Sequence, residues 1–146
     1  MKQPTESNKE EVSQEDRIKA LSKALSIPTD EAEELIDNET YKVFTDIEAT
    51  EKAEENINET LWAFNKSFLD GHSEAISQIP DAHFQKMQGE LCESFNDAVE
   101  AMIDDFDHFV EDSILSDGRA HFMNTYDGEE LEEQINGHWL YIYRVG

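Results

Sequence analysis

The C-terminal stretch LEEQINGHWLYIYRV, residues 131–145, decides the fold class because it predicts a β-hairpin. Asn136-Gly137 is a preferred dipeptide for a two-residue hairpin turn, since both positions need a positive φ. On each side of the turn, strand-forming residues alternate with other side chains. The second strand is expected to place its side chains on two faces, with Trp139, Tyr141 and Tyr143 on one face and Leu140, Ile142 and Arg144 on the other.

Two further strands are predicted upstream of this hairpin. Residues 41–44, with the sequence YKVF, are rich in strand formers and predict a short edge strand. Residues 119–126 alternate in the manner of another strand, which ends at the turn-forming pair Asp127-Gly128. The hairpin and these segments together predict a small antiparallel sheet.

The rest of the chain predicts helices, because apolar residues recur every three or four positions in four segments. Thr45 and Glu48 form a capping box at the start of the third segment, and Gly71 can end it. The predicted helices span residues 14–25, 30–37, 45–71 and 90–115, and residues 81–88 predict a short further helix. We therefore expect an α+β fold, in which two long helices pack on a small antiparallel sheet with a C-terminal hairpin, preceded by a short helical hairpin.

The predicted domain organisation has three parts. Residues 1–12 predict a disordered tail, residues 13–38 a helical hairpin, and residues 39–146 one α+β domain. The N-terminal segment is not typical of a signal peptide, and no apolar run approaches the ~20 residues of a membrane helix. We therefore expect a cytoplasmic protein with no membrane partner. The single cysteine, Cys92, excludes an intramolecular disulfide and is expected to be a buried, inert thiol.

Charge is the most informative property of the composition. The chain has 35 Asp and Glu residues against 11 Lys and Arg, which gives a formal net charge of −24. Such a charge repels phosphate backbones and anionic lipid surfaces, and so argues against direct binding of nucleic acid or membranes. It favours a basic partner, divalent cations or simply solubility. The alternative that stays open is a general acidity shared by the proteins of a salt-adapted host.

The second predicted long helix would carry a row of negative charge, because residues 87–118 contain no Lys or Arg. On a continuous helix, carboxylates three or four residues apart share one face, with ~5 Å between successive groups. A rigid row of this kind can occupy a site made for a phosphate backbone, whereas the alternative is the ordinary solvated face of an amphipathic helix. The residues expected to bind a partner are Glu93, Asp97, Glu100, Asp104, Asp107 and Glu111, and Glu90 extends the same row.

Several short phrases of the chain carry a family resemblance. They are FTDIEA at 44–49, LWAFN at 61–65, FVED at 109–112, DGRAHF at 117–122, YDGE at 126–129 and YIYR at 141–144. The chain thereby resembles a group of small acidic proteins encoded by tailed phages and prophages. The resemblance implies a phage origin and a shared fold, but the group has no established activity and supplies no catalytic residues. Ala120 stands where the group has glycine, so a positive φ at this position would strain the turn.

Residues capable of catalysis or metal binding form no complete motif. Asp105 and His108 place a carboxylate and an imidazole three residues apart, but the second such pair of a helical di-metal site is missing. Arg119 and His121 could line a polar pocket, although Arg119 is more simply expected to pair with a nearby carboxylate. The chain has no serine elbow and no phosphate-binding glycine loop. We therefore expect no enzymatic activity, no metal and no cofactor.

Together these observations predict a non-enzymatic phage accessory protein of the host cytoplasm. Its acidic row is expected to bind, and inhibit, a basic nucleic-acid-binding protein of host defence or transcription. The alternative is a structural or assembly protein that binds another phage protein through the aromatic C-terminal hairpin. An exposed patch of Trp139, Tyr141 and Tyr143 would mark that alternative. The oligomeric state is not predicted.

Overall fold

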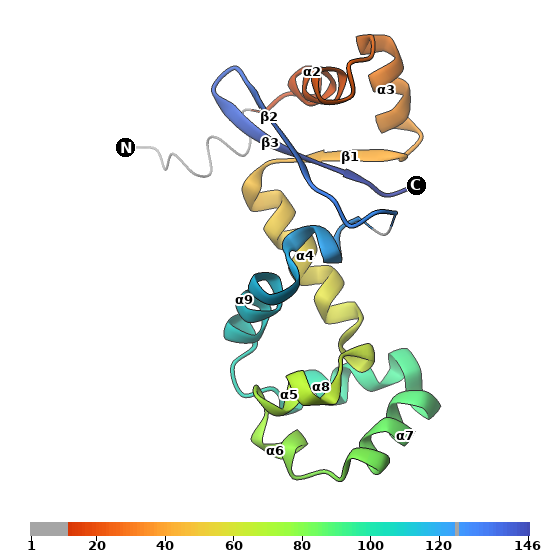
Figure 1. Cartoon of the computed structure of the whole chain (residues 1–146), viewed down its shortest axis with the longest axis vertical. Helices are drawn as coiled ribbons and strands as arrows, with labels where there is room; N and C mark the ends of the chain where they lie inside the picture. Colours follow the sequence, from red (N-terminus) through yellow and green to blue (C-terminus); the bar gives the residue numbers. More distant parts are fainter. Residues whose placement is uncertain (1–11, 125) are drawn as a thin grey trace. The chain divides into compact units, whose positions relative to one another are not determined.

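The computed structural model describes residues 12–124 and 126–146, which form two compact units (Figure 1). The first unit contains the described residues up to Ala53 together with Gly118–Gly146, and the second unit is Glu54–Asp117. This division differs from the predicted single domain over residues 39–146. The predicted tail lies outside the described residues except for Val12, which is buried in the core of the first unit rather than disordered.

The first unit contains a three-stranded antiparallel sheet and several helices, so the predicted α+β class is confirmed. The strand order is β1-β3-β2. Asn136 and Gly137 have φ values of 50° and 82° and form the predicted turn between the last two strands. The elements of this unit are α2 (Gln14–Leu25), α3 (Thr29–Asp37), β1 (Tyr41–Phe44), the start of α4 (Asp46–Glu59), the 3-10 helix η3 (Arg119–Phe122), β2 (Leu131–Ile135) and β3 (His138–Arg144).

The two short N-terminal helices, α2 and α3, pack on one face of the sheet. Ser13 caps α2, because its Oγ accepts a hydrogen bond from the Asp16 backbone N–H at 3.1 Å. We predicted two long helices on this sheet, but α2 and α3 take that position and bury its apolar face. The core shared by these helices and the sheet includes Ala20, Leu21, Ala32, Val43, Leu140 and Ile142.

The predicted capping box of Thr45 and Glu48 is confirmed at the start of α4. Thr45 Oγ1 accepts a hydrogen bond from the Glu48 N–H at 3.2 Å, and Glu48 Oε1 accepts one from the Thr45 N–H at 2.9 Å. Arg17 of α2 donates to the two Glu48 oxygens at 2.7 and 3.1 Å. Burial acts to raise the pKa of Glu48, but the hydrogen bonds from Arg17 and Thr45 outweigh it and hold the pKa below its ordinary value.

We expect Glu48→Gln to lower the free energy of unfolding of the first unit by about 1–2 kcal/mol at neutral pH. Because the pKa of Glu48 is lowered in the folded protein, its carboxylate stabilises the fold above the unfolded pKa, and this contribution is lost as pH falls through the folded pKa. Urea unfolding at a series of pH values, followed by Trp139 fluorescence in a Trp62→Phe background, should show the variant and the parent converging in acid. A difference that stays constant down to about pH 3 would contradict this account.

The second unit is built from short helices around a core of phenylalanine rings. Phe109 is fully buried, and its ring centroid lies 5.1 Å from that of Phe64 and 5.6 Å from that of Phe68. The elements that follow α4 in this unit are η1 (Leu61–Ala63), α5 (Lys66–Asp70), α6 (Glu74–Ser77), α7 (Asp81–Leu91), η2 (Cys92–Phe95), α8 (Asn96–Met102) and α9 (Phe106–Asp117).

The first predicted long helix ends earlier than expected. α4 stops at Glu59 rather than near Gly71. The side chain of Thr60 turns back to donate to the Asn56 carbonyl at 2.9 Å. Asn65 then caps a new helix, because its side-chain oxygen accepts from the Ser67 N–H at 3.0 Å. Polar side chains that bond to nearby backbone thus end one helix and start the next.

The second predicted long helix, over residues 90–115, is not continuous: residues 90 and 91 end α7, and η2, α8 and α9 follow as separate elements, so the expected rigid rod is wrong. After α7, Cys92 adopts a φ of 50°. Between α8 and α9, Ile103 is extended, and Asp105 caps α9 by accepting a hydrogen bond from the His108 N–H at 3.2 Å. On a continuous helix, seven carboxylates three or four residues apart would repel one another. The breaks separate these like charges onto different elements.

The described part of residues 119–126 is not a strand, because η3 leads into a loop in which Asn124 Oδ1 accepts hydrogen bonds from the backbone of Tyr126 and Asp127. Ala120 has no positive φ, so the alanine does not strain the backbone at this position. Cys92 is exposed rather than buried. Over the described ranges, every helix is too short or too polar to cross a membrane.

Candidate functional site: the acidic surface of the second unit

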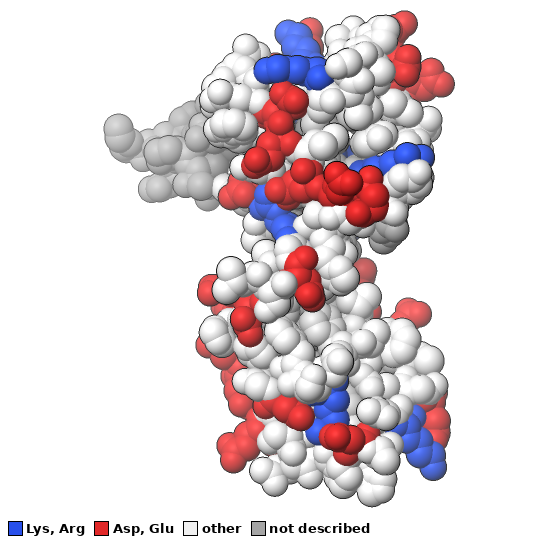
Figure 2. Space-filling model, viewed as in Figure 1, with Lys and Arg blue, Asp and Glu red and all other residues white. Residues whose placement is uncertain are grey.

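Negative charge is concentrated in the second unit, where residues 54–117 contain 16 Asp and Glu residues but two Lys and no Arg. Lys66 has 6% of its side chain exposed, and its Nζ lies 2.9 Å from Asp70 Oδ1 and 3.0 Å from Asp81 Oδ1. The hydrogen bonds to Asp70 and Asp81 raise the pKa of Lys66. Lys86 is therefore the exposed lysine of this fully described stretch, and it lies 3.8 Å from Glu90. Acidic side chains outnumber basic ones on the face drawn in Figure 2.

All six residues predicted to bind a partner are exposed, but they do not form one straight row. Only Asp104 among the six has a side-chain hydrogen bond or ion pair within the described residues, because its Oδ2 accepts from the Glu74 N–H at 3.2 Å. The regular spacing expected from a single helix is therefore absent from these described elements. The six residues are distributed as Glu93 on η2, Asp97 and Glu100 on α8, Asp104 in the following loop, and Asp107 and Glu111 on α9.

Two histidines approach each other beside the break between α8 and α9. The ring centroids of His72 and His108 are 5.3 Å apart, and His72 Nε2 lies 2.7 Å from Asp112 Oδ2. The ring of Phe109 packs edge-on against His72. Asp105 caps α9 rather than joining this cluster. In the described parts of the chain, no three His, Cys, Asp or Glu side chains are arranged to hold a metal ion.

The predicted pairing of Arg119 with a carboxylate is confirmed. Its Nη1 donates to Asp46 Oδ1 at 2.7 Å, and its Nε donates to Glu130 Oε1 at 3.1 Å. The same Nε donates to the hydroxyl of Tyr143 at 3.0 Å, and that hydroxyl donates to Glu130. His121 is exposed and makes no hydrogen bond to this network within the described residues. Arg119 therefore has a structural role at the junction of η3, α4 and β3.

The aromatic side chains of β3 do not form an exposed patch. Tyr143 is fully buried, and the guanidinium of Arg119 lies 4.7 Å from the centre of the Tyr141 ring. Trp139 is the exposed member of the three, with 53% of its surface accessible. Only the Trp139 side chain therefore remains of the exposed aromatic patch that would have indicated binding through the C-terminal hairpin.

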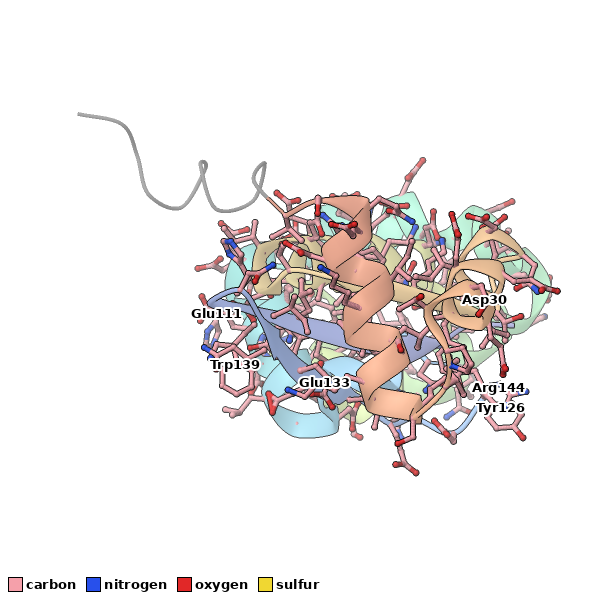
Figure 3. The ribbon with its side chains drawn as sticks, turned by 90° about the horizontal axis from the view of Figure 1, so that it is seen from above. Asp30, Glu111, Tyr126, Glu133, Trp139 and Arg144 are labelled. Carbon is pink, nitrogen blue, oxygen red and sulfur yellow. The ribbon has the colours of Figure 1, made fainter. Side chains whose placement is uncertain are left out.

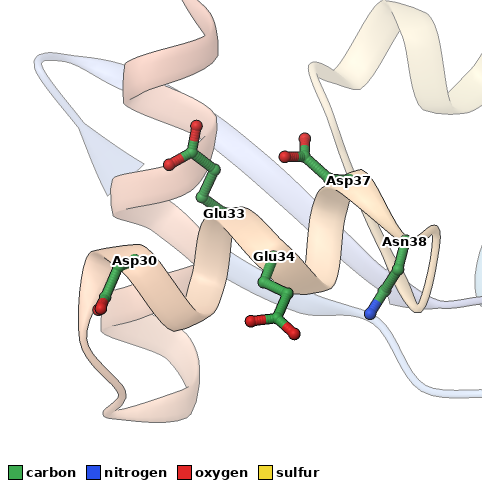
Figure 4. Close-up of a pocket in the computed structure, with 5 residues that line it drawn as sticks. All are labelled: Asp30, Glu33, Glu34, Asp37 and Asn38. Carbon is green, nitrogen blue, oxygen red and sulfur yellow. The ribbon is translucent and has the colours of Figure 1, made fainter.

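A second acidic surface, which is not among the predicted sites, lies on α3. Its exposed carboxylates line a shallow pocket of about 380 Å³ together with an asparagine (Figure 4). The signal was available in the sequence, because acidic residues three and four positions apart share a helix face. No basic, thiol or hydroxyl side chain lines this pocket, so it offers neither an anion site nor a nucleophile. The lining residues are Asp30, Glu33, Glu34, Asp37 and Asn38.

Comparisons with known proteins do not assign the chain to a family. No family model, curated protein or solved structure matches it. The resemblance to small acidic phage proteins therefore stays a prediction from the motifs.

Proposed function

We propose that the protein is a non-enzymatic binding protein, which uses the acidic surface of its second unit to bind and inhibit a basic nucleic-acid-binding protein of the host. The proposal is carried by one observation: 16 carboxylates of residues 54–117 are accompanied by two lysines, of which one is almost buried. Ordinary solvated helices mix charges of both signs, because opposite charges at helical spacings stabilise them. Here the mixing is nearly absent.

A surface of this kind selects its partner by charge. The field of clustered carboxylates speeds association with cationic proteins, and the affinity falls as salt rises. The same field repels phosphate backbones, so the partner is a protein that binds nucleic acid rather than the nucleic acid itself. The resemblance to phage proteins supports a target in host defence or transcription, and hence action in the host cytoplasm.

The broken helix changes the form of the contact that we propose. Five of the six predicted contact residues have no hydrogen bond or ion pair of their side chains within the described residues, so they can meet partner cations without breaking an internal bond. Their placement on η2, α8 and α9 fits several separate Lys or Arg side chains better than one straight groove. The irregular acidic surface of the second unit therefore replaces the regular row of phosphate-like charges.

Charge reversal on this surface tests the proposal. We expect a variant with Glu93→Lys, Glu100→Lys, Asp107→Lys and Glu111→Lys to lose at least about tenfold in affinity for proteins captured from host lysate at low salt. All four side chains are exposed, so the variant should fold. A matched control, with Asp30→Lys, Glu33→Lys, Glu34→Lys and Asp37→Lys on α3, changes the net charge equally at the other acidic surface.

The captured proteins should include nucleic-acid-binding proteins whose binding to double-stranded DNA, measured by gel mobility shift, is inhibited by the parent protein. The control variant should inhibit as the parent does, and the second-unit variant should not. Equal capture of host proteins by the second-unit variant and the α3 control would mean that net charge alone, and not the second-unit surface, determines binding. Captured proteins that still bind DNA in the presence of the parent protein would disprove inhibition.

A further inference from the structure

The outer strand β2 forms one edge of the sheet in the first unit. In the order β1-β3-β2, the two outer strands each have one neighbour. At the β1 edge, Arg17 Nη1 donates to the Val43 carbonyl at 2.9 Å and covers it. At the β2 edge, no hydrogen bond from the described residues reaches the outward backbone groups. An uncovered edge is a template for one more strand.

The hairpin register shows which backbone groups of β2 point outward. Ile135 pairs with His138 next to the two-residue turn, and such a closing pair exchanges hydrogen bonds. Hydrogen-bonded pairs then alternate along the ladder, so Glu133 also bonds to β3. The N–H and C=O groups of Glu132 and Gln134 consequently point away from β3, and no hydrogen bond from residues 12–124 or 126–146 occupies them.

The exposed side chains beside this edge include a carboxylate, an amide and an indole. Gln134 is opposite Trp139 and Glu132 is opposite Tyr141, so these side chains share the face of the sheet that α2 does not cover. Glu132, Gln134 and Trp139 are all exposed. Trp139 stands clear of the ribbon at the hairpin (Figure 3). An indole beside a carboxylate is suited to a Lys or Arg side chain, through ion pairing and cation–π contact.

Charge also determines which kind of strand can pair with the edge of β2. Glu132 has no ion pair within the described residues, whereas Glu133, on the α2 side, has Lys23 at 3.5 Å. Pairing of two β2 strands from two copies of the chain would set glutamates against glutamates, which is unfavourable. A segment with Lys or Arg at alternate positions would instead place cations next to Glu132 and towards Trp139.

We infer that the edge of β2 binds an extended basic segment of a partner protein by strand addition. The added backbone bonds to Glu132 and Gln134. A strand beside β2 lies roughly 10 Å from β3, at a spacing of ~4.8 Å per strand, and a Lys or Arg side chain of that strand and the indole of Trp139 can meet over β2 when each extends part of this distance. This binding surface lies within the first unit and does not rest on the function proposed for the second.

The test uses a blocked peptide in which Lys and Val alternate, and the full chain carrying Trp62→Phe, so that Trp139 is the only indole. We expect the peptide to change Trp139 fluorescence on binding. The same peptide with alternate backbone nitrogens methylated keeps its charge but cannot complete the ladder, and should bind at least about tenfold more weakly.

Protein variants separate strand addition from attraction by charge alone. Gln134→Pro removes an outward N–H that β3 does not use, so the edge is blocked while the hairpin ladder is kept. This variant and Glu132→Lys should each weaken binding at least about tenfold. The charge-reversed second-unit variant should bind the peptide through this edge as the parent does, which keeps this result distinct from that for the proposed function.

Equal binding of the methylated and unmethylated peptides would overturn the inference, since no ladder would then be involved. Undiminished binding by a folded Gln134→Pro variant would overturn it as well. If Gln134→Pro does not fold, the comparison of methylated and unmethylated peptides on the parent protein still tests strand addition. Dimerisation of the chain that is abolished by Gln134→Pro would assign the edge to a second copy and reject the basic segment.

Discussion

Phe109→Ala should lower the free energy of unfolding of the second unit by about 3–5 kcal/mol, the largest loss we expect from one substitution. Phe109 is fully buried, and its ring packs against those of Phe64, Phe68 and His72 at centroid distances of 5.1 to 5.6 Å. Truncation removes apolar burial and leaves a cavity that short helices close poorly. Urea unfolding followed by Trp62 fluorescence, in a Trp139→Phe background, measures this loss.

The matched control lies on the same helix. Leu115 of α9 is 84% exposed, so Leu115→Ala should change the free energy of unfolding by no more than about 0.5 kcal/mol. Each unit contains one tryptophan, which lets the unfolding of each be followed separately. A Phe109→Ala protein as stable as Leu115→Ala would contradict the assignment of Phe109 to the core of the second unit.

The elements that could be predicted from the sequence are those with local signals. Asn136-Gly137 requires positive φ at both positions, Thr45 and Glu48 cap each other, and Pro28 separates two amphipathic segments, so each of these features determines its own geometry. The observed hairpin, the start of α4, and α2 with α3 accordingly lie where these signals place them.

The break in residues 90–115 could not be predicted in the same way, because tertiary hydrogen bonds accompany the local cap of Asp105. The side chain of Asn96 accepts from the Trp62 N–H at 2.8 Å and donates to the Glu59 carbonyl at 2.6 Å. The backbone N–H of Asp104 donates to the His72 carbonyl at 2.9 Å. Apolar spacings continue across these points, so periodicity alone indicates one helix.

The exposure of the six candidate carboxylates could be predicted from the sequence, but their arrangement could not. The six carboxylates are exposed, as a polar helix face predicts, because solvation does not depend on whether the helix is continuous. The alignment of the six carboxylates does require a continuous helix, and the helix is interrupted at Cys92 and Ile103. The burial of Lys66 could not be predicted from the sequence, because it depends on how α5 and α7 bring its two partners, Asp70 and Asp81, together.

Arg119→Leu should be the second most damaging substitution, because it leaves an uncompensated carboxylate inside the first unit. The side chains of Arg119 and Glu130 are 13% and 24% exposed, and Glu130 also accepts a hydrogen bond from the buried Tyr143. Burial and that hydrogen bond raise the pKa of Tyr143, so its hydroxyl stays protonated and cannot replace the lost cation. Asp46, at 69% exposure, is solvated and adds little.

We expect Arg119→Leu to lower the free energy of unfolding of the first unit by about 3 kcal/mol, measured by urea unfolding with Trp139 as the reporter in a Trp62→Phe background. Arg144→Leu is the matched control. It also removes an arginine from a tyrosine ring, but that ring belongs to Tyr126, which is 62% exposed, so the loss should be about 0.5 kcal/mol.

Adding Glu130→Gln to Arg119→Leu should restore part of the stability, because the unpaired charge is then removed. If Glu130→Gln instead destabilises the Arg119→Leu protein as much as it destabilises the parent, the two side chains are not coupled, and the network around Arg119 does not hold η3 to the sheet.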